Sequence, residues 1–330
     1  MAELKLPLSL LDEDFNSEGI LLVYPSKLNY SFETLLDFKK FYKDYVDLIP
    51  EEIEVTWIIK NKEIKNEIQR NFYKRKFNFI IFPEIEDIWC GDWVPFFVED
   101  QNKNIFGVQF IYNSSMNDEK AGQFVFNNYY KYKVIKIPLI LDGGCFESNL
   151  DEFIIISKKI FDLNPKIKEE EITSLLKTYF KVKDVFYFDY NSKLGHADIL
   201  FRGIKKDVFI YSVFENKETY PNLIKLFDEI KIKYPNCKFH PIPNEISGKI
   251  MEDTGNGDFY GEENYIGNIM DFIIVGKYLI FPIFTERSKL AKKVIENLLP
   301  SDIQIIEFES ENLKSLYKFG GGLYCITTNY

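Results

Sequence analysis

Residues 19–60, GILLVYPSKLNYSFETLLDFKKFYKDYVDLIPEEIEVTWIIK, contain two short apolar runs on either side of a longer amphipathic segment. The outer runs, 19–25 and 54–60, are rich in Ile, Leu and Val, which is typical of short buried strands. Between them, apolar residues in 31–48 return every three or four positions, which predicts a helix. This stretch therefore predicts a strand–helix–strand unit.

The same alternation continues through the rest of the chain. Further strands are expected at turn-bounded apolar runs, namely 77–83, 106–112, 134–141, 153–157, 185–190, 207–214, 272–284 and 302–308. Further amphipathic helices are expected at 62–73, 169–180, 219–234 and 286–299. The length alone would allow about two domains. Because no Ser/Gly-rich linker interrupts the pattern, we predict an α/β fold built from a repeated β/α module, forming one domain over residues 1–330.

Composition and charge limit the classes of partner that this protein is expected to bind. The chain has 330 residues, of which 46% are hydrophobic and 28% charged, enough to bury a sizeable core. Its net charge of −10 would repel phosphate backbones and anionic lipid, so we expect neither nucleic acid nor membrane as a partner. The most apolar segment, 270–284, is interrupted by Asp271 and Lys277, and the N-terminus lacks a signal-peptide pattern. A cytoplasmic protein is expected.

Several site classes are excluded by missing motifs. Four widely spaced cysteines make no disulfide framework, and with two histidines and no CxxC pair we expect no metal and no cofactor. Neither a G-x-G-x-x-G turn nor a GxxxxGK[ST] loop occurs, which removes the dinucleotide-binding and NTPase classes. The acidic, glycine-containing stretch 251–264 is expected to be a solvated surface loop, with a lid as the less favoured interpretation.

Four short segments place reactive or charged residues beside glycines or turns: 89–95 (WCGDWVP), 141–145 (LDGGC), 195–202 (GHADILFR) and 320–328 (GGGLYCITT). If 196–200 is extended, His196 and Asp198 share one face of a strand, next to Gly195, which leaves room for a ligand. A structural hydrogen-bonded pair is the commoner role for such residues. Buried acids near Trp and Gly are costly unless a cation, such as a substrate, meets them.

Cys325 follows the glycine run 320–322, and we expect it at the start of an apolar strand. A lone cysteine is most often buried and inert. A cysteine nucleophile needs a lowered pKa or a nearby base, which His196 could supply. Asp92 and Asp198 offer the charge-assisted acceptors that a planar guanidinium requires.

The order WxxDxxP, L[ED]GG, GHxDxxxR and GGGxxCIT resembles the agmatine deiminase and bacterial peptidylarginine deiminase family of the guanidine-modifying superfamily. The resemblance implies a pentein fold, with five ββαβ modules in pseudo-fivefold symmetry around a central channel that holds the active site. It implies that Cys325 attacks the guanidinium carbon to form an amidino-thioether, and that His196 protonates the departing ammonia and then activates water. Asp92 and Asp198 would hold the guanidinium nitrogens. The matching motifs also place further residues at the substrate, namely Asp142, Trp89, Trp93 and Gly322.

The sequence departs from the family pattern at several positions. Gly91 stands where most relatives have Arg, Val94 where they have Gly, and Asp142 where many have Glu. Asp271 occupies what looks like the place of an Asn in the relatives. The Cys325, His196, Asp92 and Asp198 set is intact, so these changes bear on which substrate is accepted.

The implied activity is hydrolysis of a guanidino substrate to a ureido product and ammonia. Agmatine is the first candidate, and free or peptidyl arginine comes next. Amidino transfer to an amine would use the same covalent intermediate, and a non-catalytic binding protein is an alternative from another class. The expected partner is thus a cationic guanidino small molecule or an arginine side chain, and homo-oligomerisation stays open.

Overall fold

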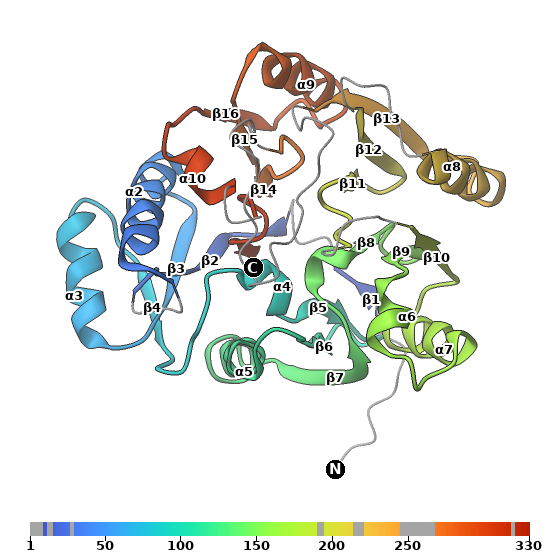
Figure 1. Cartoon of the computed structure of the whole chain (residues 1–330), viewed down its shortest axis with the longest axis horizontal. Helices are drawn as coiled ribbons and strands as arrows, with labels where there is room; N and C mark the ends of the chain where they lie inside the picture. Colours follow the sequence, from blue (N-terminus) through green and yellow to red (C-terminus); the bar gives the residue numbers. More distant parts are fainter. Residues whose placement is uncertain are drawn as a thin grey trace. The chain divides into compact units, whose positions relative to one another are not determined.

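The computed structural model describes residues 9–11, 16–26, 30–189, 195–213, 221–244, 268–317 and 321–330 (Figure 1). The stretch 251–264 and Gly320, considered above, lie outside the described residues. The chain divides into two compact units. The first comprises Met1–Asp12, Asp92–Tyr211 and Thr219–His240; the second comprises Glu13–Gly91, Ser212–Glu218 and Pro241–Tyr330.

The first sheet of the first unit has the strand order β1-β5-β6-β7. Its strands are Ser9–Leu10, Phe96–Glu99, Ile105–Ile111 and Lys133–Ile140. β5 and β6 are antiparallel, whereas β6 and β7 are parallel. A parallel pair needs a crossover, and here it is α5 (Met116–Phe124) continuing into the π-helical turns η1 (Val125–Tyr130).

Two further sheets follow the same plan. The order β10-β9-β8 is made by Asp184–Phe188, Phe153–Ser157 and Phe146–Ser148, with α6 (Lys159–Leu163) and α7 (Glu169–Phe180) leading from β9 to its parallel neighbour β10. The order β11-β12-β13 is made by Phe201–Lys205, Val208–Val213 and Lys238–Pro243, with α8 (Pro221–Lys233) before β13. The last residues of β12 and β13 fall in the second unit.

The second unit holds two sheets. The order β17-β2-β3-β4 is made by Thr328–Asn329, Gly19–Val23, Glu54–Ile59 and Asn78–Ile81, and α2 (Phe32–Leu48) and α3 (Lys62–Asn71) connect its parallel strands. The order β14-β15-β16 is made by Ile273–Val275, Tyr278–Pro282 and Gln304–Phe308, with α9 (Glu286–Glu296) as the crossover and α10 (Leu313–Tyr317) after it. Pairing of β17 with β2 brings the end of the chain back to its first long strand.

The sequence pattern explains these elements locally. The Ser31 hydroxyl caps α2 by accepting from the Thr34 amide, at 3.2 Å, and α9 begins with a capping box at Thr285. The inner face of α2 buries Phe38, Phe41 and other aromatic residues. Strands such as β9 are buried on both faces, as parallel strands covered by helices are.

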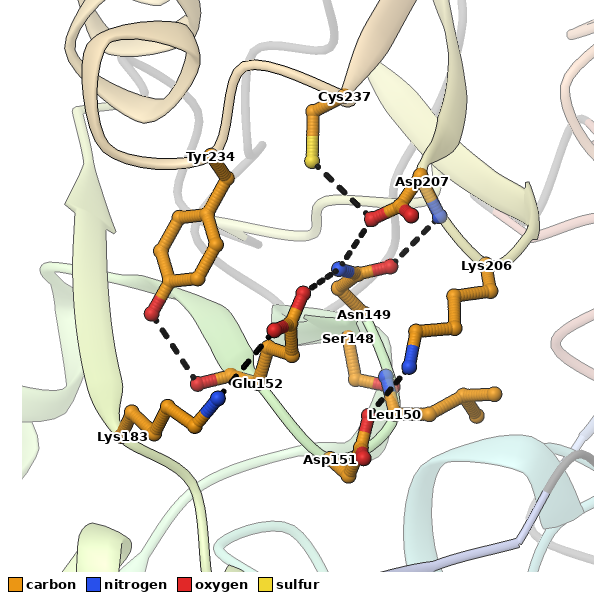
Figure 2. A network of polar contacts seen from close by, with 10 residues as sticks. All are labelled: Ser148, Asn149, Leu150, Asp151, Glu152, Lys183, Lys206, Asp207, Tyr234 and Cys237. Atoms are coloured by element: carbon orange, nitrogen blue, oxygen red, sulfur yellow. Dashed lines mark hydrogen bonds and ion pairs between the residues drawn. The ribbon is translucent and has the colours of Figure 1, made fainter.

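A polar network in the first unit links the β8–β9 turn to the β11–β12 turn (Figure 2). The Asn149 side-chain amide donates to Asp207 Oδ1 at 2.8 Å, and its oxygen accepts from the Asp207 amide at 2.7 Å. Leu150 and Asp207 adopt left-handed φ angles of 57° and 62° at these turns. Gly203 in β11 also donates its amide to Glu147 in β8, at 3.0 Å. The network therefore fixes β8 against β11. The candidate site residues 142–145 and 196–198 lie shortly before these two strands.

The predicted helices are confirmed to within a few residues, and so are most of the predicted strands. The predicted strand 272–284 is instead a hairpin, because Gly276 turns the chain at φ 53° between β14 and β15. The condition that 196–200 is extended is not met, and the prediction that Cys325 begins a strand is wrong, since both segments are turns. The single domain over residues 1–330 stays a prediction.

Candidate active site

His196 lies in a tight turn of the first unit, directly before β11. Gly195 takes a left-handed φ of 65°, which lets the chain reverse, and the amides of Leu200 and Phe201 both donate to the Ala197 carbonyl, at 2.8 and 2.9 Å. The Ala197 amide donates to the Gly144 carbonyl at 2.7 Å. The turn thus presents His196 to the residues before β8, and its side chain is only 6% exposed.

The His196 imidazole packs so closely on Gly144 that a side chain at this position would not fit. A Cβ atom at this position would lie 2.9 Å from both Cγ and Cε1 of His196, and nearer still to Nδ1, whereas ordinary contacts begin at 3.4 Å. Because Gly144 does not adopt a positive φ, its backbone alone would accept alanine. The glycine is therefore needed for space, because the His196 ring packs directly against the backbone of this L[ED]GG motif.

Three carboxylates surround this imidazole. His196 Nδ1 lies 4.0 Å from Asp92 Oδ1 and 3.8 Å from Asp198 Oδ1, and Nε2 lies 3.9 Å from Asp142 Oδ2. Asp92 comes from the short helix α4 (Cys90–Trp93), and its Oδ1 also accepts from the Gly144 amide at 3.3 Å. The structure therefore brings together, within one unit, four of the residues predicted from the sequence.

The protonation states follow from this crowding. Burial lowers the pKa of His196, but the charges of Asp92, Asp198 and Asp142 outweigh burial and raise it to about 9, so the ring is an imidazolium at neutral pH. Burial is the main reason that the pKa of Asp92 is raised to about 7, against the opposing charge of His196. Burial would also raise the pKa of Asp142, but the neighbouring His196 and Lys159 outweigh burial and lower it.

Lys159 is a site residue that the sequence reasoning missed. Its ammonium lies 3.1 Å from Asp142 Oδ2, and both side chains are mostly buried. Lys159 opens α6 directly after β9, a position at which no sequence motif singled it out. Because the pKa of Asp92 is raised to about 7, a cation that binds beside Asp92 would favour its ionised form.

The second unit holds Cys325 in a turn that precedes β17. The Cys325 carbonyl accepts from the Gly91 amide at 2.9 Å, and the side chain is mostly buried, with the residue 7% exposed. A Cβ atom on Gly91 would lie 2.7 Å from the Tyr324 carbonyl oxygen. The residue in the place of the family arginine is thus packed directly on the cysteine turn.

Neighbouring side chains occupy the space beside two glycines that precede Cys325. A Cβ atom on Gly322 would lie 2.5 Å from Cβ of Asp271, and one on Gly321 would lie 2.7 Å from Cη2 of Trp89. Asp271 in turn lies near the nucleophile candidate, with its Oδ1 4.0 Å from Cys325 Sγ. The second unit therefore gathers Trp89, Gly322 and Cys325, with the buried Asp271 beside them, and the roles predicted for these residues stay predictions.

Comparison with known proteins was decisive for the family. The family model described as Porphyromonas-type peptidyl-arginine deiminase matches residues 9–330. The chain belongs to this family. The structure of C. jejuni agmatine deiminase is similar to this peptidyl-arginine deiminase family member, with a TM-score of 0.79 and 21% identity over 98% of this chain and 96% of the other. The structure of a Cys-to-Ser variant of that enzyme with substrate bound has a TM-score of 0.80 and 20% identity, over 99% of this chain and 98% of the other.

A sequence relative from Mycoplasma capricolum, named provisionally as an agmatine deiminase, is 22% identical over 88% of this chain and 86% of its own. Together with the five small sheets found among the described residues, these likenesses confirm the five-module pentein fold for this member of the peptidyl-arginine deiminase family. Among the described residues, no helix has both the length and the apolar character needed to cross a bilayer.

One predicted substrate residue of this family member is deeply buried. Trp93 is 1% exposed, and its carbonyl accepts from Gln109 Nε2 at 2.7 Å, so its environment is that of a core side chain. Its contact with substrate stays a prediction. Cys145 is a further residue that the sequence analysis left unassigned, and with Asp142 and His196 it offers ligand atoms lying within 4.8 Å of one another.

Proposed function

We propose that this chain is a hydrolase that converts a guanidino group into a ureido group and ammonia, with agmatine as the first candidate substrate. The observation that carries the proposal is the buried imidazolium of His196 surrounded by Asp92, Asp142 and Asp198. A site of this kind combines a proton donor with three carboxyl groups. Those are the two requirements for binding a planar cation and releasing one of its nitrogens.

Binding is assigned to Asp92 and Asp198. Carboxylates accept charge-assisted, often bidentate hydrogen bonds from guanidinium N–H groups, and these bonds are strongest where water is excluded. Asp198 is 1% exposed, and the Asp92 side chain is 13% exposed. A bound guanidinium would stabilise the ionised form of Asp92 and so lower its pKa from about 7.

The chemical steps use Cys325 and His196. We assign Cys325 Sγ as the thiolate that forms a bond to the guanidinium carbon, while the bond from that carbon to one terminal nitrogen breaks. His196 gives its ring proton to the departing nitrogen, which leaves as ammonia. The neutral ring then takes a proton from water, whose oxygen attacks the amidino carbon. The carbon–sulfur bond breaks, which restores the thiolate, and the second proton of that water leaves to the ammonia or to solvent as the ureido product is released.

The relatives support the order of substrates. The solved C. jejuni enzymes are named agmatine deiminases, and the one with substrate bound carries serine in place of a cysteine, which fits a cysteine needed for turnover. The family model is described as a peptidyl-arginine deiminase, so an arginine side chain is the next candidate. Gly91 and Asp142, where this sequence departs from the family pattern, are the positions at which a shift in substrate choice is expected.

The test is ammonia release from agmatine, free arginine and an arginine-containing peptide. Cys325→Ala is expected to abolish release while retaining substrate affinity in calorimetry, because the carboxylates remain. Cys237→Ala is the matched control, since the Cys237 thiol contacts Asp207 Oδ1 at 3.5 Å and has no role in the proposed reaction (Figure 2). Equal activity in Cys325→Ala would overturn the nucleophile assignment.

Product analysis separates the alternative functions. A ureido product without any acceptor is expected for a hydrolase. Formation of a new guanidino product only when an acceptor amine is added would identify amidino transfer. Binding of these compounds by the folded protein with no product of either kind would identify a binding protein.

A further inference from the structure

The buried cluster around His196 in the first unit also contains a set of metal-ligand atoms. Asp142, Cys145 and His196 each offer one metal-ligand atom, all three residues are buried, and these atoms lie within 4.8 Å of one another. We propose that these three residues bind a borderline-soft divalent cation of the Zn²⁺ class, and that its binding inhibits the protein. The binding stands on its own, whereas the inhibition rests on the proposed role of His196.

The donor types select the class of cation. One sulfur, one imidazole nitrogen and one carboxylate oxygen form a set that suits Zn²⁺, whereas Ca²⁺ and Mg²⁺ prefer oxygen ligands throughout. Three protein ligands leave a fourth tetrahedral position for water. No metal was expected from the sequence because ligands are few along the chain, whereas the fold brings the 142–145 turn to His196.

The spacing is close to what coordination needs. Metal–ligand lengths of about 2.0–2.3 Å place two tetrahedral ligands roughly 3–4 Å apart. The ligand atoms that Asp142, Cys145 and His196 offer lie within 4.8 Å of one another. Asp142 and Cys145 are held on one short turn, because the Cys145 amide donates to the Asp142 carbonyl at 3.1 Å. Side-chain shifts of about 1 Å would therefore complete the site, without a change of fold.

Asp142 has an oxygen available for this purpose. Within the described part of the chain, its buried Oδ1 has no hydrogen-bond partner, while its Oδ2 accepts from Lys159 at 3.1 Å. A buried carboxylate oxygen left in this state is costly unless a ligand meets it. A cation on Oδ1 would leave the Lys159 bond in place, and Asp92 and Asp198 would offset the lysine's repulsion.

The charge balance also permits binding. Coordination forms a metal–sulfur bond to Cys145 and a metal–nitrogen bond to His196, and the thiol proton and one imidazolium proton leave to solvent. One divalent cation thus replaces two protons, so the net charge of the buried cluster does not change. The occupied imidazole can then no longer deliver a proton to a leaving nitrogen.

Cobalt absorbance tests the site without relying on activity. Metal-free Cys325→Ala protein, in which the nucleophile candidate cannot bind metal, is titrated with Co²⁺. A thiolate-to-cobalt charge-transfer band is expected, and Zn²⁺ is expected to displace it. The band should vanish in Cys145→Ala/Cys325→Ala, and in Cys145→Ser/Cys325→Ala, which keeps the side-chain volume. No band in folded Cys325→Ala, or a band that survives in a folded double variant, overturns the site.

Zinc inhibition of ammonia release tests the consequence. Cys145→Ala in the otherwise unchanged protein should raise the Zn²⁺ concentration for half-inhibition by about tenfold or more, as loss of a metal ligand requires. An unchanged value overturns the inhibitory role. If the unchanged protein releases no ammonia from any guanidino compound, the proposed function has failed, and the cobalt band still decides the metal site.

Discussion

Replacing Gly144 by alanine is the sharpest test of how the fold holds the acid–base residue. The added Cβ would lie 2.9 Å from Cγ and Cε1 of His196, and ordinary contacts begin at 3.4 Å. The ring must therefore retreat by about half an ångström at its carbons and by more at Nδ1. Because a misplacement of about 1 Å at a catalytic group can cost 10²-fold in rate, we expect kcat to fall by about 10- to 100-fold, or about 1.4–2.7 kcal/mol.

The assay is steady-state ammonia release at saturating substrate, with the folded fraction of each variant measured by thermal unfolding. Some loss of stability is expected too, about 1–3 kcal/mol for overpacking. Gly203→Ala is the matched control in the same unit, since its Cβ would meet its nearest neighbour, the Ser148 carbonyl, at 3.2 Å. Unchanged kcat in folded Gly144→Ala would refute the steric argument, and so would an equal loss in Gly203→Ala.

Three further outcomes are expected. Because the pKa of His196 is raised from 6.5 to about 9, the folded protein holds a proton that the unfolded chain loses, so the free energy of unfolding should fall by up to about 3 kcal/mol as pH rises from 6.5 through 9. Urea titrations at several pH values should show that this fall disappears in His196→Asn. It should persist in the control His240→Asn, because the pKa of His240 is lowered rather than raised. A fall that persists in both variants contradicts the assignment. Asn149→Ala should cost about 1–3 kcal/mol in urea unfolding, because two partly buried hydrogen bonds to Asp207 are lost, whereas Asp151→Ala, at an exposed ion pair, should cost under about 1 kcal/mol; equal costs would argue against the network. Asp198→Asn should weaken agmatine binding by several kcal/mol in calorimetry, and unchanged affinity would show that the carboxylate does not meet the guanidinium.

Regular periodicity in the sequence predicted the long elements well. Residues 31–48 and 169–180 have a clear helical repeat, and the structure has α2 and α7 there. The strands that were missed are mainly short: β5, β8 and β11 have three to five residues each, too few to establish an alternating pattern. β13 was missed as well, and its HPIP segment places two prolines in a strand, which argues against a strand from sequence alone.

The site shows a similar division. The motif glycines marked the turns that carry His196 and Cys325, but neither segment is a strand, because the hydrogen bonds of each turn close locally. Lys159 was missed because its partner Asp142 is distant in sequence and no motif contains the lysine. Asp271 was noted in the sequence, but its position beside Cys325 could be known only from the structure.

Sequence alone determined the alternation of strands and helices, the motif order that indicates the family, and the residue types needed for guanidinium chemistry. These properties are local, since they depend on side-chain periodicity and on the identity of single residues. Tertiary structure decided which charges meet. Only after folding do Asp92, Asp142 and Asp198 come within about 4 Å of one imidazole, and at that distance, away from water, their charges outweigh the cost of burial and keep His196 protonated.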